Sequence, residues 1–325
     1  MILTAHRPVL MKFQSLIALF VLCFAISLLS DKFLTVDNGW NVLRQISVNI
    51  CISVGMTFVV LTAGIDLSVG SVLAFCGALT AGLLKNGIQF PEGDLFIGFT
   101  LFGVILVGIM VGCLMGTMNG WVITKFNVPP FVATLAMLTI ARGLTMLYTQ
   151  GFPISGLGEN FSYLGTGWLL GIPVPVWISA AVVLIAVIIT NKTRLGRYIY
   201  AIGGNESASK LSGININKVK IIVYAIAGGL AALGGLIVTS RLDSAQPNAG
   251  NSYELDAIAA VVIGGTSLAG GKGSILGTVL GAIIIGVLNN GLVLLNVSPF
   301  WQQVVKGLVI LLAVIIDKSN SKSTN

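Results

Sequence analysis

Long apolar segments separated by short polar ones run along most of the chain. Most of them approach the ~20 residues that an α-helix needs to cross a bilayer. They predict an all-α polytopic membrane protein with about ten membrane-spanning helices, some of them short or broken. The expected spans are residues 13–29, 46–63, 69–84, 95–115, 131–148, 174–190, 219–240, 255–264, 275–295 and 300–316.

Two positions interrupt this pattern. Residues 64–71 (GIDLSVGS) separate the second span from the third, and residues 255–264 are too few to cross a bilayer as a helix. A glycine-rich turn, 264–273, follows the short segment. Residues 62–73 resemble residues 264–276, which indicates either paired breaks in a transport pathway or two turns that are alike by chance. If the chain has ten spans, the two similar segments have the same orientation in the membrane and the repeat is parallel. An inverted repeat would require that one span has been miscounted.

The longest polar interval between two apolar runs covers residues 191–220. Its middle predicts a short surface helix, with Asn205 as the N-cap, Glu206 in the first turn, Lys210 late and Gly213 just past the end. Such a capped helix outside the bilayer offers a partner a surface to bind. The interval holds six of the eighteen basic residues, namely Lys192, Arg194, Arg197, Lys210, Lys218 and Lys220.

The other basic residues support one orientation in the membrane. Twelve of the eighteen fall on the side of the 191–220 interval, and Arg142 and Lys306 lie within spans. The opposite side has four, which are Lys32, Arg44, Lys85 and Arg241. Because Lys and Arg accumulate in cytoplasmic loops, we expect the interval and both termini in the cytoplasm. Residues 31–44, 85–94 and 149–173 are then outer loops.

Composition excludes several other classes of protein. The chain is 55% hydrophobic and 9% charged, far from the roughly quarter-charged composition of a soluble domain. A net charge of +7 does not indicate nucleic-acid binding, because the basic residues lie between apolar runs. The cysteines Cys23, Cys51, Cys76 and Cys113 have no metal-ligand spacing, and His6 is the single histidine, so neither a metal site nor a disulfide frame is expected. No cleavage pattern follows the first apolar run, which we interpret as a retained helix.

Charged residues near the spans are the candidates for chemistry. A carboxylate in the bilayer is costly unless it is paired or hydrated, so Asp66 is expected to face backbone N–H groups or water. Asp66 is predicted to be a gate residue, or else Asp66 or Ser68 caps the third helix, and the two roles are compatible. Arg142 within the fifth span is also costly, and it is expected either to extend its charged end toward the interface or to pair, with Glu159 as a candidate partner. Lys306 is expected in the bundle interior or at the outer interface.

Polar and small residues complete the candidate pathway. Amides inside a membrane bundle line its interior or hold helices together. The pathway or gate candidates are Gly64, Asp66, Ser68, Gly70, Gly264, Gly265, Thr266, Asn289 and Asn290.

Sites for enzyme catalysis are absent from the sequence. A phosphate-binding loop needs Gly-x-x-x-x-Gly-Lys-Ser/Thr, and residues 266–273 lack both the first glycine and the final hydroxyl. No Ser/His/Asp set or close pair of carboxylates is present either. The chain is therefore predicted not to be an enzyme, with no cofactor of its own, and to move or hold another molecule.

Three segments resemble the signature segments of permease subunits of bacterial ABC sugar importers. They are residues 54–71, 196–220 and 252–274, and the resemblance extends over residues 15–317. Within this family the ribose permeases are the most similar. The resemblance implies a type II ABC importer-like bundle formed by one domain, residues 1–325. It also implies a homodimer in the bacterial inner membrane that receives ribose or a related sugar from a periplasmic binding protein. A cytoplasmic ATPase subunit, which holds the ATP and magnesium, would drive transport.

The same resemblance implies that the capped helix couples the permease to its ATPase. Here the sequence departs from the Glu-Ala-Ala…Gly motif of ABC importers, because Ser207 stands in the middle and four residues separate Ala208 from Gly213. The coupling residues are Asn205, Glu206, Ser207, Ala208, Ser209, Lys210, Leu211, Ser212 and Gly213. The alternative is an ion-coupled secondary transporter of a small polar solute, which needs intramembrane carboxylates as relays, and only Asp66 offers one. A structural scaffold leaves the capped helix and the glycine breaks unexplained.

Overall fold

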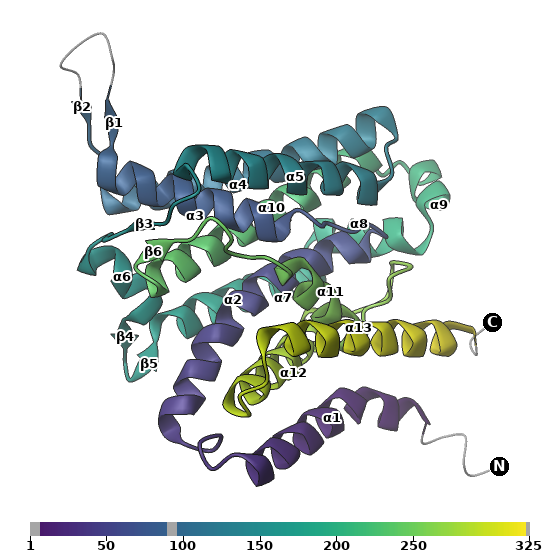
Figure 1. The fold of residues 1–325 in the computed structure, drawn as a ribbon. Coiled ribbons are helices and arrows are strands. Elements are labelled where there is room, and N and C mark those ends of the chain that lie inside the picture. The colour runs from purple at the N-terminus through teal and green to yellow at the C-terminus, as the bar shows by residue number, and fades with distance from the viewer. Residues whose placement is uncertain (1–6, 90–95, 323–325) are drawn as a thin grey trace.

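A computed structural model describes residues 7–89 and 96–322 (Figure 1). The fold is almost entirely helical, which confirms the all-α prediction, and seven of the described helices are long and apolar enough to cross a membrane. The helices are α1 (Arg7–Leu29), α2 (Val36–Leu61), α3 (Val69–Asn86), α4 (Leu101–Phe126), α5 (Pro130–Thr149), α6 (Glu159–Thr166), α7 (Val174–Lys192), α8 (Arg194–Gly204), α9 (Glu206–Leu211), α10 (Ile216–Arg241), α11 (Tyr253–Ile263), α12 (Ile275–Leu294) and α13 (Pro299–Lys322).

Three pairs of very short antiparallel strands lie in the connections between helices. They pair β1 (Ile88–Gln89) with β2 (Phe96–Ile97), β3 (Ile154–Ser155) with β6 (Ser244–Ala245), and β4 (Trp168–Leu169) with β5 (Ile172–Pro173). The β3–β6 pair joins two connections that are far apart in sequence. Residue His6, residues 90–95 of the expected 85–94 turn and the end of the polar tail at 323–325 lie outside the described residues.

Two helices, α2 and α4, differ most in extent from the prediction. Helix α2 begins at Val36, where Thr35 caps it by accepting a hydrogen bond from the Asn38 amide, so the expected outer loop over residues 31–44 is wrong in its second half. Helix α4 begins at Leu101 after strand β2 and continues to Phe126, well beyond the expected end at residue 115. In both cases a threonine cap fixed the helix start, a local signal that hydropathy alone does not register.

Helix α10 is the centre of the bundle and packs against α2, α3 and α4. Small residues permit this close approach. A Cβ at Gly228 of α10 would clash with the Gly112 carbonyl of α4, and one at Gly235 would clash with Leu73 of α3. Membrane helices associate through such small-residue contacts because lipid provides no hydrophobic force between them.

The short apolar segment is a short helix, as predicted. Helix α11 has 11 residues and packs against α2, α12 and α13. At 1.5 Å per residue it extends about 16 Å, roughly half of the ~30 Å hydrocarbon core. Figure 1 shows α11 in the middle of the view, reached from β6 by a connection that runs inward.

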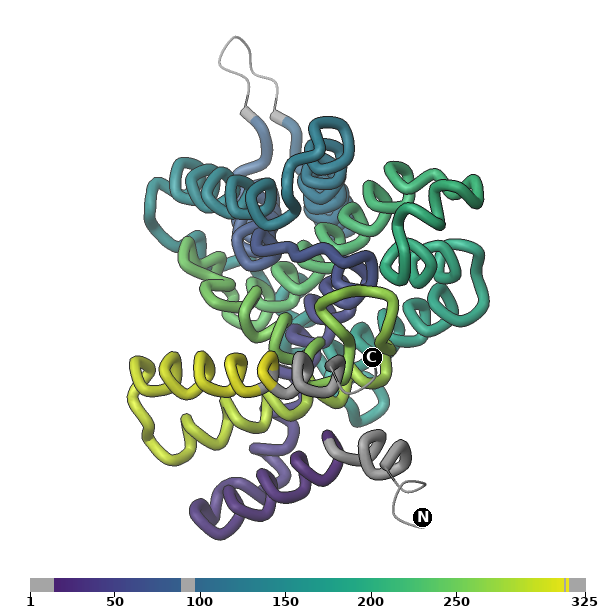
Figure 2. The backbone as a smooth tube through the Cα atoms, turned by 90° about the vertical axis from the view of Figure 1, so that its right-hand side faces the viewer, coloured from purple at the N-terminus to yellow at the C-terminus, as the bar shows by residue number. Residues whose placement is uncertain are grey.

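The two ends of the bundle differ in what they carry. Helix α9, the start of α1, the end of α13 and the 264–273 turn lie at one end, while the three strand pairs and α6 lie at the other (Figure 1). Figure 2 looks onto the end that bears α9. Helix α9 and the described ends of the chain therefore lie at the same end of the bundle, as the distribution of basic residues along the sequence predicts.

Candidate functional site

Helix α9 has the caps that its sequence predicts. The Asn205 side chain accepts a hydrogen bond from the Ala208 amide at 2.9 Å. At the other end Gly213 has φ +82°, and the Ile214 amide bonds back to the Ser209 carbonyl at 3.1 Å. This is a Schellman arrangement, which requires a left-handed residue where Gly213 stands. The sequence therefore defines both ends of a six-residue helix.

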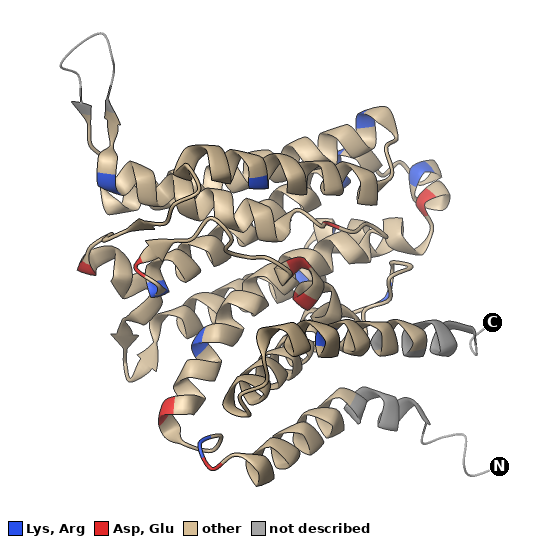
Figure 3. Ribbon diagram, viewed as in Figure 1, with Lys and Arg blue, Asp and Glu red and all other residues tan. Residues whose placement is uncertain are grey.

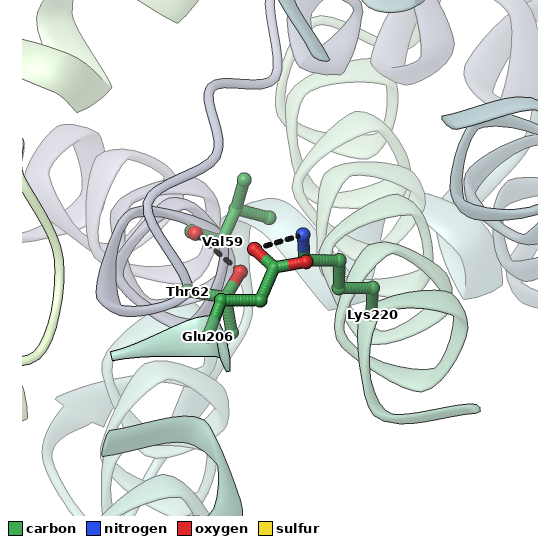
Figure 4. A network of polar contacts seen from close by, with 4 residues as sticks. All are labelled: Val59, Thr62, Glu206 and Lys220. Atoms are coloured by element: carbon green, nitrogen blue, oxygen red, sulfur yellow. Dashed lines mark hydrogen bonds and ion pairs between the residues drawn. The ribbon is translucent and has the colours of Figure 1, made fainter. Parts of the chain in front are cut away.

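One face of α9 is exposed and the other is held by the bundle. Leu211 is 90% exposed, whereas Ser209 is 5% exposed. An ion pair of 2.8 Å joins Glu206 to Lys220 on α10, as Figure 4 shows together with the bond from the Thr62 hydroxyl to the Val59 carbonyl. An exposed pair of this kind adds little stability.

Helix α8 precedes α9 and was not predicted as a separate element. Thr193 caps it by accepting a hydrogen bond from the Gly196 amide, and Ile199 and Ile202 are buried beneath it. The signal in the sequence was the apolar spacing of Leu195, Ile199 and Ile202, which places them on one face of a helix. Helix α8 therefore lies on the bundle and connects α7 to α9.

The end of α8 meets two other segments at one point. The Tyr200 hydroxyl donates a hydrogen bond to the Gly273 carbonyl at 2.9 Å. The Gly271 amide donates a hydrogen bond of 3.0 Å to the carbonyl of Leu61, which is the last residue of α2. Gly203 fits between them, where a Cβ would clash with both the Leu61 oxygen and the Gly271 nitrogen. We call this contact of α2, α8 and the 264–273 turn the three-way junction.

The break between α2 and α3 holds the buried Asp66, which is 1% exposed. Its Oδ1 accepts hydrogen bonds from the Ser68 amide at 2.9 Å and the Ser68 hydroxyl at 2.6 Å. The Asn119 amide donates to that hydroxyl at 3.0 Å, and the Tyr224 hydroxyl donates to the Ile65 carbonyl at 3.3 Å. The expectation that Asp66 faces backbone N–H groups is confirmed. Of the two predicted caps, Ser68 is wrong, because it occupies the N-cap position of α3 without a side-chain cap bond, whereas Asp66 binds the backbone amide of that N-cap residue.

Arg142 has a different partner from the predicted one. It donates hydrogen bonds to the carbonyls of Pro247 and Ala249 at 2.7 and 2.9 Å. Glu159 instead stands at the start of α6. Carbonyls of the connection between α10 and α11 thus satisfy this arginine, and its expected pairing with Glu159 is wrong.

A charge pair with a buried aspartate and a partly buried lysine joins α13 to α11. The Lys306 ammonium lies 2.9 Å from Asp256 Oδ2, and the Asn289 amide donates to the same oxygen at 3.3 Å. Neither Asp256 nor its role was predicted, although an acid in the short apolar segment was a signal for a partner of Lys306. Asn290, by contrast, exchanges hydrogen bonds with Asn38 on α2 at 2.9 and 3.1 Å. The two neighbouring amides therefore belong to different contacts.

The glycine candidates separate into two groups. Gly64 lies in the α2–α3 break, and Gly70 lies in the first turn of α3, where it packs against the Gly250 carbonyl and the Glu254 side chain. In the 264–273 turn Gly264 packs against Gly277, Gly265 has φ +84°, and Thr266 is fully buried. The three-way junction connects these groups, because Leu61 comes just before the α2–α3 break and Gly271 lies in the 264–273 turn.

A pocket of about 300 Å³ opens in the connection between α10 and α11. The sequence predicts only that this segment faces the outer side, because Arg241 falls opposite the 191–220 interval. The polar residues that line it are Arg241, Gln246, Asn248, Asn251 and Tyr253. Figure 3 shows that charges gather mainly toward the two ends of the bundle, whereas α11, with Glu254 and Asp256, carries acidic residues in the middle.

Similarity to known proteins extends along nearly the whole chain. A family described as branched-chain amino acid transport system / permease component matches residues 39–314. The chain belongs to this permease family. Ribose import permease protein RbsC of Haemophilus influenzae is 54% identical, with 94% of this chain and 92% of that protein covered. The RbsC proteins of Escherichia coli K12 and Bacillus subtilis are 52% and 50% identical, with 95% and 96% of this chain and 94% of each protein covered.

No solved structure matches this permease. The family match begins inside α2 and ends inside α13. Helix α9, the two glycine-rich breaks and the pocket between α10 and α11 therefore all lie within the residues that match the family.

Proposed function

We propose that the chain is the membrane-spanning permease subunit of an ATP-driven importer of ribose, or of a closely related sugar, in the bacterial inner membrane. The observation that carries this proposal is an identity of 50–54% to ribose import permeases over at least 94% of the chain. A match of this length leaves room for few structural differences. The substrate class follows from those relatives, while the fold alone fits many transported solutes.

The topology that fits this function has ten spans in one domain, residues 1–325, in a type II ABC importer-like bundle. Helices α1, α11 and α13 would join the seven long apolar helices. Both termini and the 191–220 interval would face the cytoplasm, and the excess of basic residues in that interval supports this orientation. The strand pairs and α6 would face the periplasm.

The permease would work in a complex. A cytoplasmic ATPase subunit would bind ATP and magnesium, a periplasmic binding protein would deliver the sugar, and two copies of this chain would form a homodimer. The chain itself would be no enzyme. Metal-ligand clusters are absent from its described residues.

Helix α9 is the proposed coupling element, with residues 205–213 in the contact. Leu211 is an apolar anchor that is 90% exposed, and a partner groove would bury it. Closure of the ATPase subunits would displace α9, and α8 would transmit the displacement through the three-way junction to the α2–α3 break and the 264–273 turn. Gly64, Asp66, Ser68, Gly70, Gly264, Gly265 and Thr266 would then move with the gate, and Asn289 would line its far side.

The test is import by the purified complex in proteoliposomes. Labelled ribose should accumulate only with the ATPase, the binding protein and ATP all present. Uptake without any ATPase, driven by a proton or sodium gradient, would instead support the ion-coupled transporter. Competition by unlabelled pentoses and hexoses identifies the sugar.

Two serines of α9 provide a matched test of coupling. Ser207 is exposed and Ser209 is 5% exposed, although they are two residues apart on one helix. Ser207→Cys should crosslink to the ATPase with a thiol-directed reagent, and Ser209→Cys should crosslink far less. Equal crosslinking of both, or none from Ser207→Cys in an active complex, would contradict the proposed contact.

A further inference from the structure

We infer that the pocket between α10 and α11 is a low-affinity sugar site, which receives the substrate when the binding protein releases it. This inference rests on the proposed function and gives that function a location. The pocket volume of about 300 Å³ lies at the small end of the 300–1,000 Å³ that ligand pockets usually have. A single monosaccharide suits that size.

Apolar atoms make up most of the lining surface, and amides are set among them, a combination that suits the C–H faces and the hydroxyl groups of a monosaccharide. Gln246, Asn248 and Asn251 each carry an amide, and an amide both donates to and accepts from hydroxyl groups. Tyr253 adds an aromatic ring, and Arg241 is the one charged residue in the lining. An anionic ligand would call for more positive charge, and an apolar one would not need three amides.

The pocket is built on a connection that is held on three sides. Arg142 donates to the carbonyls of Pro247 and Ala249, which fixes the middle of the connection. Pairing of β3 with β6 fixes its start. At its end, Gly250 has φ +71° and packs directly on the backbone of Gly70. The backbone is therefore preorganised, while Asn248 and Asn251 remain exposed.

The position of the pocket fits a receiving site. Its lining includes Arg241 and Leu242 at the outer end of α10 and Tyr253 at the start of α11. Gly250, which also lines the pocket, packs on Gly70 in the first turn of α3, close to the break that holds Asp66. A sugar in the pocket would lie between the periplasmic end of the bundle and the proposed gate.

Thiol protection tests the site directly. Leu242 lines the pocket, is 49% exposed and carries no polar group, so Leu242→Cys keeps the proposed ligands intact. Leu170→Cys is the matched control, because Leu170 is 85% exposed in the β4–β5 connection and is not part of the lining. The permease–ATPase complex in lipid nanodiscs, without the binding protein, is labelled with a membrane-impermeant maleimide. Wild-type complex measures the background from the native cysteines.

D-ribose at ~20 mM should slow labelling of Leu242→Cys by about 3- to 20-fold for a Kd of about 1–10 mM, since protection follows 1 + [L]/Kd. Leu170→Cys should be unaffected, and sucrose at the same concentration should protect neither. Adding Asn248→Ala and Asn251→Ala to Leu242→Cys should abolish the protection.

Unchanged labelling with ribose, or equal protection by sucrose or of Leu170→Cys, would overturn the inference. Ribose import by the same complex, after the binding protein is added, tests the proposed function separately. Import without protection refutes this site alone.

Discussion

Gly203→Ala is the most direct perturbation of the three-way junction, and Gly204→Ala is its control. Both glycines end α8, and neither has a left-handed φ, so alanine suits the backbone at each. Their surroundings differ. A Cβ at Gly204 meets nothing within 4 Å, whereas a Cβ at Gly203 clashes with Leu61 and Gly271.

The expected difference between the variants can be worked from these contacts. In a helix, alanine is favoured over glycine by roughly 0.5–1 kcal/mol, so Gly204→Ala should be neutral or slightly stabilising. Gly203→Ala must move the neighbouring backbone by on the order of 1 Å, and overpacking of this kind costs about 1–3 kcal/mol. If the Gly271–Leu61 hydrogen bond is lost as well, a further ~1 kcal/mol follows. Gly203→Ala should thus unfold about 2–4 kcal/mol more easily than Gly204→Ala.

Two measurements check this prediction. Thermal unfolding of the purified permease in detergent reports stability, and the ratio of ribose imported to ATP hydrolysed in proteoliposomes reports coupling. Gly203→Ala should lower both, because the displaced backbone separates α8 from α2 and from the 264–273 turn. Gly204→Ala should match the wild type in both.

The reasoning fails if the two variants behave alike. A Gly203→Ala complex with wild-type stability would show that the junction relaxes without cost. One with reduced stability but an unchanged import ratio would show that the junction holds the fold together without transmitting motion.

Three other substitutions test separate contacts. Asp66→Asn keeps an acceptor for the Ser68 amide and should retain much of the uptake that Asp66→Leu loses, and an inactive but assembled Asn variant would show that the charge itself is needed. Lys306→Met leaves Asp256 buried without its cation and should cost about 3 kcal/mol of unfolding free energy. Adding Asp256→Asn should recover part of that loss, and no recovery would contradict a direct pair. Gly213→Val strains a residue at φ +82° and should reduce import per ATP while surface labelling shows normal membrane insertion.

Local signals in the sequence account for the helices and for α9. In lipid each backbone polar group needs a partner within its own segment, so a long apolar run becomes a helix wherever it lies. This is why the spans at residues 131–148 and 174–190 correspond closely to α5 and α7. The caps of α9 are local as well, since Asn205 and Gly213 act within a few residues of themselves.

Partners across the bundle were decided by tertiary structure alone. Arg142 bonds to backbone carbonyls more than a hundred residues away. Every residue type has such a carbonyl, so the sequence does not indicate which one will accept the bond. Lys306 meets Asp256 because α11 is short and α13 packs on it. Nothing in the sequence distinguishes Gly203 from other glycines. Its role depends on the tertiary contact of α2, α8 and the 264–273 turn around it. The helices follow from the sequence because their hydrogen bonds are local, whereas the junction and the pocket depend on how distant segments meet.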